Sequence, residues 1–241
     1  MMKLKYKNNS LRSEYNKIIT IGPEGSNTDI EIPNDVYRIE KLTFQNFPEL
    51  KRVVIPNNIK AIDFGAFEDC VLLDEIILPN NINEIQPFAF SNTNIRTINL
   101  PDSLRHIGAH AFAASGLRKV DIPNQVEVID ERAFFNCSDL EFLKIPHSVK
   151  YIGDNLCCGC DSLKEVIMEA ECKLPSKLFN YCDNLEKIYI TKESFAKSPD
   201  FIKEYSDKIE IINKSLDELL DEGKSFREAS RIIKESNEII K

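Results

Sequence analysis

No stretch of the sequence approaches the roughly 18 consecutive apolar residues that a membrane-spanning helix needs. An excess of positive charge is absent as well, because the formal net charge is −8 and the isoelectric point is about 5.1. Proteins that bind nucleic acid or anionic membranes use clustered Lys and Arg side chains. The composition therefore predicts no nucleic-acid partner and no membrane span.

The sequence also lacks the short motifs of common catalytic and nucleotide-binding sites. It contains no G-x-G-x-x-G, no Walker A pattern, no G-x-S-x-G and no H-E-x-x-H. Only three histidines occur, and the spacing of His106 and His110 does not place them on one face because no helix is expected there. The carboxylates are scattered over loop positions, as on a solvated surface. We predict a non-enzymatic protein with no catalytic residue and no cofactor.

A secretory signal is missing from the first residues. The stretch M-M-K-L-K-Y-K-N-N carries lysines, but no apolar run of about 7 or more follows it. The seven cysteines are an odd number, which suits a reducing compartment better than a disulfide framework. The predicted location is cytoplasmic, with the cell surface as the alternative if the chain is trimmed.

A unit of 22 or 23 residues recurs along the chain, and Leu117–Cys137 is a clear copy of it. Its first half, Leu117–Ile122, alternates apolar and polar residues as a strand with one buried face does. Pro123 cannot donate a backbone hydrogen bond and ends the strand. The same position of the other copies holds Pro33, Pro56, Pro79, Pro101 and Pro146, and then Glu169 and Thr191 in two degenerate copies.

A second column follows the prolines by eleven residues. It consists of Phe44, Phe67, Phe90, Phe112, Phe134 and Cys157, with Phe179 ten residues after Glu169. A fixed period of this length indicates a solenoid, because one coil cannot bury its apolar face alone. The motif L-x-x-[IV]-x-[IL]-P-x-x-[IVL]-x-x-I-x-x-x-A-F-x-x-C resembles the BspA-like family of leucine-rich repeats over roughly residues 28 to 190. The resemblance implies a right-handed solenoid that binds other macromolecules, and it implies no catalytic residue.

Three segments are expected. Residues 1–27 do not match the repeat, and the strand-like Lys17–Ile21 suggests a β cap over the first coil. Residues 28–212 form the solenoid of about eight coils with one long parallel sheet, and the last coil is degenerate. Residues 213–241 are expected to be helical, with capping patterns at Ser215 and Ser225. The predicted fold class is an α/β-type, mainly β leucine-rich-repeat solenoid with a C-terminal α-helical tail.

The outer face of the sheet is the predicted partner-binding surface. Alternation along each strand turns one set of side chains inward, so the residues between them point outward. Mixed charges lie along this face, with Val54 and Ile77 near one end and Phe142, Ile167 and Tyr189 near the other. Clustered exposed apolar and aromatic side chains are typical of interfaces. The predicted binding residues are Val54, Ile77, Phe142, Lys144, Ile167, Lys187 and Tyr189. In the alternative, the C-terminal helices cover the patch.

The cysteines raise the question of a metal site, especially C-C-G-C at Cys157, Cys158 and Cys160. However, Cys70, Cys137, Cys160 and Cys182 share one repeat column, three residues after the phenylalanine position, which Thr93 and Ser115 fill in other copies. A column with these members requires a small side chain, and buried cysteine behaves as a small hydrophobe. We therefore predict no metal site.

Three functions remain open on the sequence alone. The first is a protein–protein interaction module that binds along the sheet face, and the second is a cell-surface adhesin or host-factor binder. The third is a structural subunit that self-associates through a helix at Ser225–Lys241. No feature of the sequence identifies the protein partner.

Overall fold

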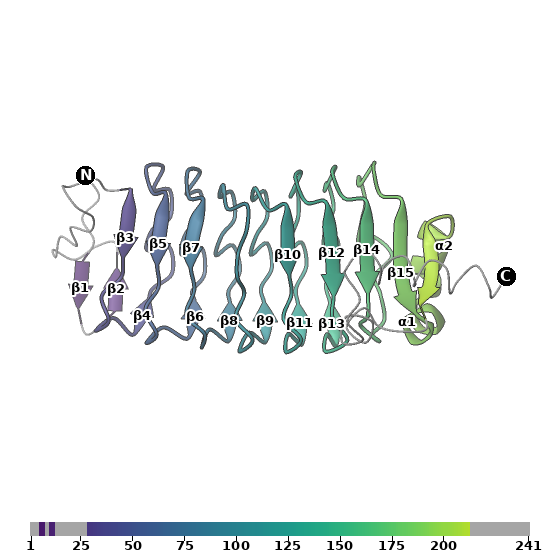
Figure 1. Ribbon diagram of the computed structural model, residues 1–241, viewed down its shortest axis with the longest axis horizontal. Coiled ribbons are helices and arrows are strands. Elements are labelled where there is room, and N and C mark those ends of the chain that lie inside the picture. Colours follow the sequence, from purple (N-terminus) through teal and green to yellow (C-terminus); the bar gives the residue numbers. More distant parts are fainter. Residues whose placement is uncertain (1–4, 8–9, 13–27, 213–241) are drawn as a thin grey trace, which may run out of the picture.

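The computed structural model describes residues 5–7, 10–12 and 28–212, and it confirms a mainly β parallel solenoid of about eight coils. All coils but one contribute a strand to a long outer sheet, and most coils add a two-residue strand to a second row (Figure 1). The outer sheet contains β3 (Asp29–Glu31), β5 (Arg52–Val54), β7 (Glu75–Ile77), β10 (Lys119–Asp121), β12 (Phe142–Ile145), β14 (Glu165–Met168), β15 (Lys187–Thr191) and β16 (Ile209–Ile212). The second row contains β4 (Arg38–Ile39), β6 (Ala61–Ile62), β8 (Glu84–Ile85), β9 (His106–Ile107), β11 (Val128–Ile129) and β13 (Tyr151–Ile152).

A ladder of phenylalanines runs through the core, as the repeat column predicts. Five rings, Phe44, Phe67, Phe90, Phe112 and Phe134, stack on their neighbours with centroids 5.0–5.6 Å apart and fully buried side chains. The backbone N–H of each ladder residue donates to a carbonyl of the next coil, as from Phe67 to Ala89 O at 2.9 Å. Stacking and hydrogen bonding thus join every coil to the next along the same line.

Two turn positions in each coil from Phe44 to Cys157 adopt left-handed backbone conformation, and one does so in the coil of Phe179. One lies two residues before the ladder position, and the other lies two residues after it. The second column is Asn46, Asp69, Asn92, Ala114, Asn136, Gly159 and Tyr181, with φ between 54° and 76°. Asn, Asp and Gly tolerate this region better than other residues do, which explains their frequency here.

The long sheet is interrupted once. Residues 95–100 form no strand, so β3, β5 and β7 pair in one sheet and β10, β12, β14, β15 and β16 pair in another. The prediction of one continuous sheet is therefore wrong at this coil. Asn99 belongs to a residue type that is depleted in strands, which fits the position of the gap.

The two ends differ from the regular coils. β1 (Lys5–Lys7) and β2 (Ser10–Arg12) pair antiparallel, and β2 pairs in parallel with β4. The predicted strand Lys17–Ile21 lies outside the described residues.

At the other end, α1 (Lys192–Lys197) and α2 (Pro199–Tyr205) precede β16. β16 pairs in parallel with β15 as an added edge strand. Phe201 and Tyr205 are buried against Phe179, whereas Phe195 is exposed. The predicted helical tail, residues 213–241, lies outside the described part of the chain.

Candidate functional site on the outer face of the sheet

The accessible part of the outer face lies over β3, β5, β7 and β10. Parallel pairing places Glu31, Val54 and Ile77 in one row across three strands. The side chain of Ile77 is 41% exposed and that of Val54 is half-buried. The neighbouring inward residues, Val53 and Ile76, belong to the core. The alternation rule therefore identifies the exposed residues of this half correctly.

Charged side chains surround this apolar pair and neutralise one another in part. The guanidinium Nε of Arg52 lies 3.0 Å from the carboxylate of Glu75, and its Nη1 lies 3.9 Å from the carboxylate of Glu31. Lys119 Nζ lies 3.1 Å from the carboxylate of Asp121 on the same strand. Exposed ion pairs of this kind are each worth about 0–1 kcal/mol, so they arrange the surface more than they stabilise it.

At the C-terminal half of the sheet the predicted exposure is wrong for two residues. The side chains of Ile167 and Tyr189 are each 1% exposed, and that of Phe142 is half-buried. Alternation determines the face to which a side chain points, but it does not determine whether that face is open to solvent. The alternative prediction is that the C-terminal helices cover this patch. The predicted helical tail, residues 213–241, lies outside the described ranges.

The two predicted lysines lie in ion pairs at this buried end. Lys144 Nζ is 3.3 Å from the carboxylate of Glu169, whose side chain is only 2% exposed. Lys187 forms an ion pair with Glu210 on β16. Because a buried carboxylate requires a charged or hydrogen-bonding partner, Lys144 compensates Glu169 and is less available to an external ligand than its sequence position suggests.

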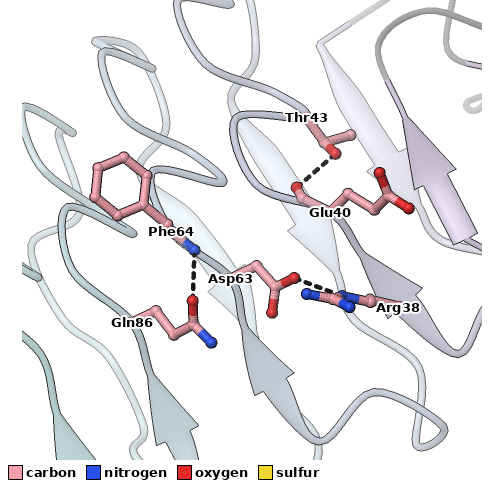
Figure 2. A network of polar contacts seen from close by, with 6 residues as sticks. All are labelled: Arg38, Glu40, Thr43, Asp63, Phe64 and Gln86. Atoms are coloured by element: carbon pink, nitrogen blue, oxygen red, sulfur yellow. Dashed lines mark hydrogen bonds and ion pairs between the residues drawn. The ribbon is translucent and has the colours of Figure 1, made fainter.

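The second row of strands has its own polar contacts, which join successive coils. Figure 2 shows Arg38 Nε donating to the buried carboxylate of Asp63 at 2.7 Å, and the contact raises the pKa of Arg38. In the next pair, the side-chain oxygen of Gln86 accepts from the backbone N–H of Phe64 at 3.1 Å. Each of these contacts joins residues of two neighbouring coils, so we assign them to the stacking of the coils.

The histidines have structural surroundings. His106 Nε2 lies 2.7 Å from the carboxylate of Asp130, and Nδ1 lies 3.5 Å from that of Glu84. His110 stacks on Phe88 with centroids 4.7 Å apart and also contacts Phe135. Sequence reasoning missed this row of turn aromatics, because its members do not occupy one strict repeat column.

The cysteine column forms hydrogen bonds in addition to filling space. The thiols of Cys70, Cys137 and Cys160 donate at 3.1 Å to the carbonyls of Phe44, Phe112 and Phe134, the ladder residues of the preceding coil. Burial raises the pKa of Cys70 to about 12 and also raises that of Cys157. Metal ligation requires the thiolate, which burial disfavours at Cys70 and Cys157.

Across residues 5–7, 10–12 and 28–212, no group of three or more His, Cys, Asp or Glu side chains is placed to hold a metal ion. In the same residues no helix is long and apolar enough to cross a bilayer.

Comparison with known families gives an extended match. A family model described as "BspA type Leucine rich repeat region (6 copies)" matches residues 24–141 and 106–218. No curated protein matches the chain.

The solved structures that are similar to this one are bacterial leucine-rich repeat proteins. A leucine-rich repeat protein from Bacteroides ovatus has a TM-score of 0.68 at 24% identity, over 83% of this chain and 56% of that one. The chain thus spans little more than half the length of that protein. A leucine-rich repeat protein of T. pallidum has a TM-score of 0.47 at 22% identity, over 84% of this chain and 90% of that one. The first likeness shows the fold.

Proposed function

Because the chain belongs to the BspA-type leucine-rich repeat family, we propose that it is a non-enzymatic module that binds another protein. The proposed contact surface is the outer face of β3, β5, β7 and β10. The observation that carries this proposal is the exposure of Ile77 beside Val54, an apolar pair within a charged surface. Apolar centres with polar rims are the usual anatomy of protein interfaces.

The mechanism of binding is preorganisation. The backbone of the sheet is fixed by parallel hydrogen bonding, and the side chains behind it are packed in one continuous core. A partner that docks on such a surface orders few additional groups, so less conformational entropy is lost than with a flexible loop. Among the residues predicted from the sequence, Val54 and Ile77 are the centre of the proposed contact. Ile167 and Tyr189 are left out because they are buried.

The test compares three proteins in a pull-down from native lysate: the full chain, a variant with Val54→Lys and Ile77→Lys, and a control with Val71→Lys and Leu72→Lys. The control residues are exposed apolar side chains in the turn before β7, 45% and 47% exposed. We expect a partner that the first variant loses and the control retains, with unchanged circular dichroism for both. Retention of every partner by the first variant contradicts the proposal.

A cytoplasmic location remains part of this proposal, supported by seven cysteines without a disulfide. The competing function is a cell-surface adhesin, which the family resemblance permits. Fractionation of native cells distinguishes the two, because surface labelling of intact cells reaches only the adhesin. Self-association through Ser225–Lys241 concerns residues outside the described ranges and stays a prediction.

A further inference from the structure

The accessible sheet face carries a symmetric order of charge and apolarity. Glu31, Val54 and Ile77 are register partners on β3, β5 and β7. Asn99 and Asp121 hold the same position in the next two coils. Across these five coils the row therefore reads acidic, apolar, apolar, polar, acidic, and its next register partner is Lys144, which pairs with the buried Glu169. The carboxylates at the two ends of this five-coil stretch are well exposed, with side-chain values of 71% for Glu31 and 77% for Asp121.

The charges of this face do not balance. The outward positions of β3, β5, β7 and β10 hold four carboxylates and two cations, which gives 2 − 4 = −2. Both cations, Arg52 and Lys119, already lie within 3.1 Å of a carboxylate of the face. The surplus is therefore negative, and it lies on β3, β5 and β7, because Lys119 and Asp121 cancel on β10.

We infer that the partner presents a basic segment to this face, with two neighbouring apolar side chains between Lys or Arg residues. This inference rests on the proposed function and specifies the chemistry of its partner. The apolar side chains would cover Val54 and Ile77, while the basic ones reach Glu31 and Asp121. Electrostatic complementarity of this kind selects partners and accelerates association, and it opposes an anionic ligand on the same surface.

The dimensions of the row define a probe. Four coil steps of about 4.8 Å separate Glu31 from Asp121, a span of about 19 Å. A helix with a rise of about 1.5 Å per residue covers that span with about 13 residues. A suitable probe is a labelled helical peptide of that length, with two Leu on one face and two Lys near each end. The same peptide with Glu in place of each Lys is its acidic counterpart.

The experiment measures fluorescence polarisation of both peptides with three forms of the full chain. The forms are the unaltered protein, a double variant Glu31→Lys and Asp121→Lys, and a control Glu131→Lys and Asp154→Lys. The control changes net charge equally at exposed turn positions away from the sheet face. We expect saturable binding of the basic peptide to the unaltered protein and to the control. We expect about tenfold weaker binding, or more, to the double variant.

Salt gives a second readout. Binding should weaken as ionic strength rises from about 0.01 M to about 0.15 M, because the screening length falls from about 30 Å to about 8 Å. Equal losses of affinity for the basic peptide in the control and in the double variant would overturn the inference, since general attraction to an acidic protein would explain them. Failure of the basic peptide to bind, or equal binding of the acidic peptide, would also overturn it.

The failure of this inference is distinguishable from failure of the proposed function. One outcome is that binding of the natural partner is abolished by Val54→Lys and Ile77→Lys but unchanged by Glu31→Lys and Asp121→Lys. In that case the face binds a partner, but the binding does not depend on basic side chains of that partner. If neither variant affects the partner, the proposed function itself is wrong.

Discussion

Glycines of the second row of strands illustrate how tightly the coils approach one another. A Cβ atom added to Gly153 would lie 2.2 Å from the backbone nitrogen of Glu131, a distance that no relaxation of side chains can relieve. We expect Gly153→Ala to lower the free energy of unfolding by about 1–3 kcal/mol. Urea denaturation measures the change.

Gly116→Ala is the matched control for that substitution. Its added Cβ would lie 3.3 Å from the carbonyl oxygen of Asn94, so a small shift accommodates it. The unfolded chain loses similar conformational freedom in both variants. Equal destabilisation by the two substitutions would refute the assignment of close backbone contact at Gly153.

His110 makes stability depend on pH. Burial, and then the positive charge of Arg132, lower the pKa of His110 in the folded chain. The unfolded chain therefore binds the proton at a higher pH, near its ordinary value of about 6.5. The contribution of neutral His110 to the free energy of unfolding is complete above that pH. It is lost as the pH falls toward the lower pKa of His110 in the folded chain.

The measurement is thermal unfolding between about pH 5 and pH 8 for the unaltered chain and for His110→Phe. Phe88 already occupies the equivalent turn position of the preceding coil with φ of 60°, so the substitution preserves the stacked row. We expect the variant to lose less stability than the unaltered chain on acidification. Identical pH profiles of the two proteins would show that His110 contributes nothing to the pH dependence of stability.

At the scale of single elements, strand length can be compared between coils with and without proline. The strands β3, β5, β7 and β10, which lie before prolines, have three residues. By contrast, β14 has four residues and is followed by Glu169, and β15 has five and ends at Thr191. The backbone N–H of Glu169 donates to Ile145 O at 2.8 Å, a bond that proline cannot form. β12 also has four residues although Pro146 follows it. The longest strand, β15, therefore lacks the proline, but a four-residue strand forms with or without it.

Glu169→Pro tests this hydrogen bond and the ion pair with Lys144 together. We expect a loss of about 3 kcal/mol or more in the free energy of unfolding, because the N–H is removed and the half-buried Lys144 loses its partner. Glu169→Gln keeps the N–H and removes only the charge, so its smaller loss isolates the ion pair. Equal losses for the two variants would mean that the backbone bond contributes nothing.

Sequence periodicity predicted the elements of the solenoid, because each coil repeats the same physical requirement. The inward residues, the phenylalanine ladder and the small cysteine column all follow from it. The short helices α1 and α2 were not predicted, since the repeat has decayed there. Phe195 in α1 is exposed, although phenylalanine is a core residue in the regular coils.

The candidate site was predicted only in part. Ile77 and Val54 were placed correctly, but the burial of Ile167 and Tyr189 was not, because it depends on what covers a face and not on the local alternation. The two-residue second row also escaped detection, since a period of two cannot be recognised over two residues.

At the scale of the whole molecule, the chain is a one-dimensional stack in which each coil contacts mainly its neighbours. Repeat proteins of this kind have stability that sums over coils and the interfaces between them. Phe112 lies in the middle of the ladder, with centroid distances of 5.4 Å to Phe90 and 5.6 Å to Phe134. Phe201 lies at the last coil and packs on Phe179 and Tyr205.

Truncation of either ring removes a similar volume, so the two variants differ in position more than in chemistry. Phe112→Ala should cost about 3–5 kcal/mol, and it weakens the interfaces to both neighbouring coils. We expect the two halves of the stack to unfold in separate steps, with a lower urea m-value for each than for the unaltered chain. Phe201→Ala removes packing at one end only, so the remaining coils should unfold together with nearly the original m-value. A single transition with unchanged m-value in Phe112→Ala would show instead that cooperativity extends across the defect, and the coils would then behave as one unit.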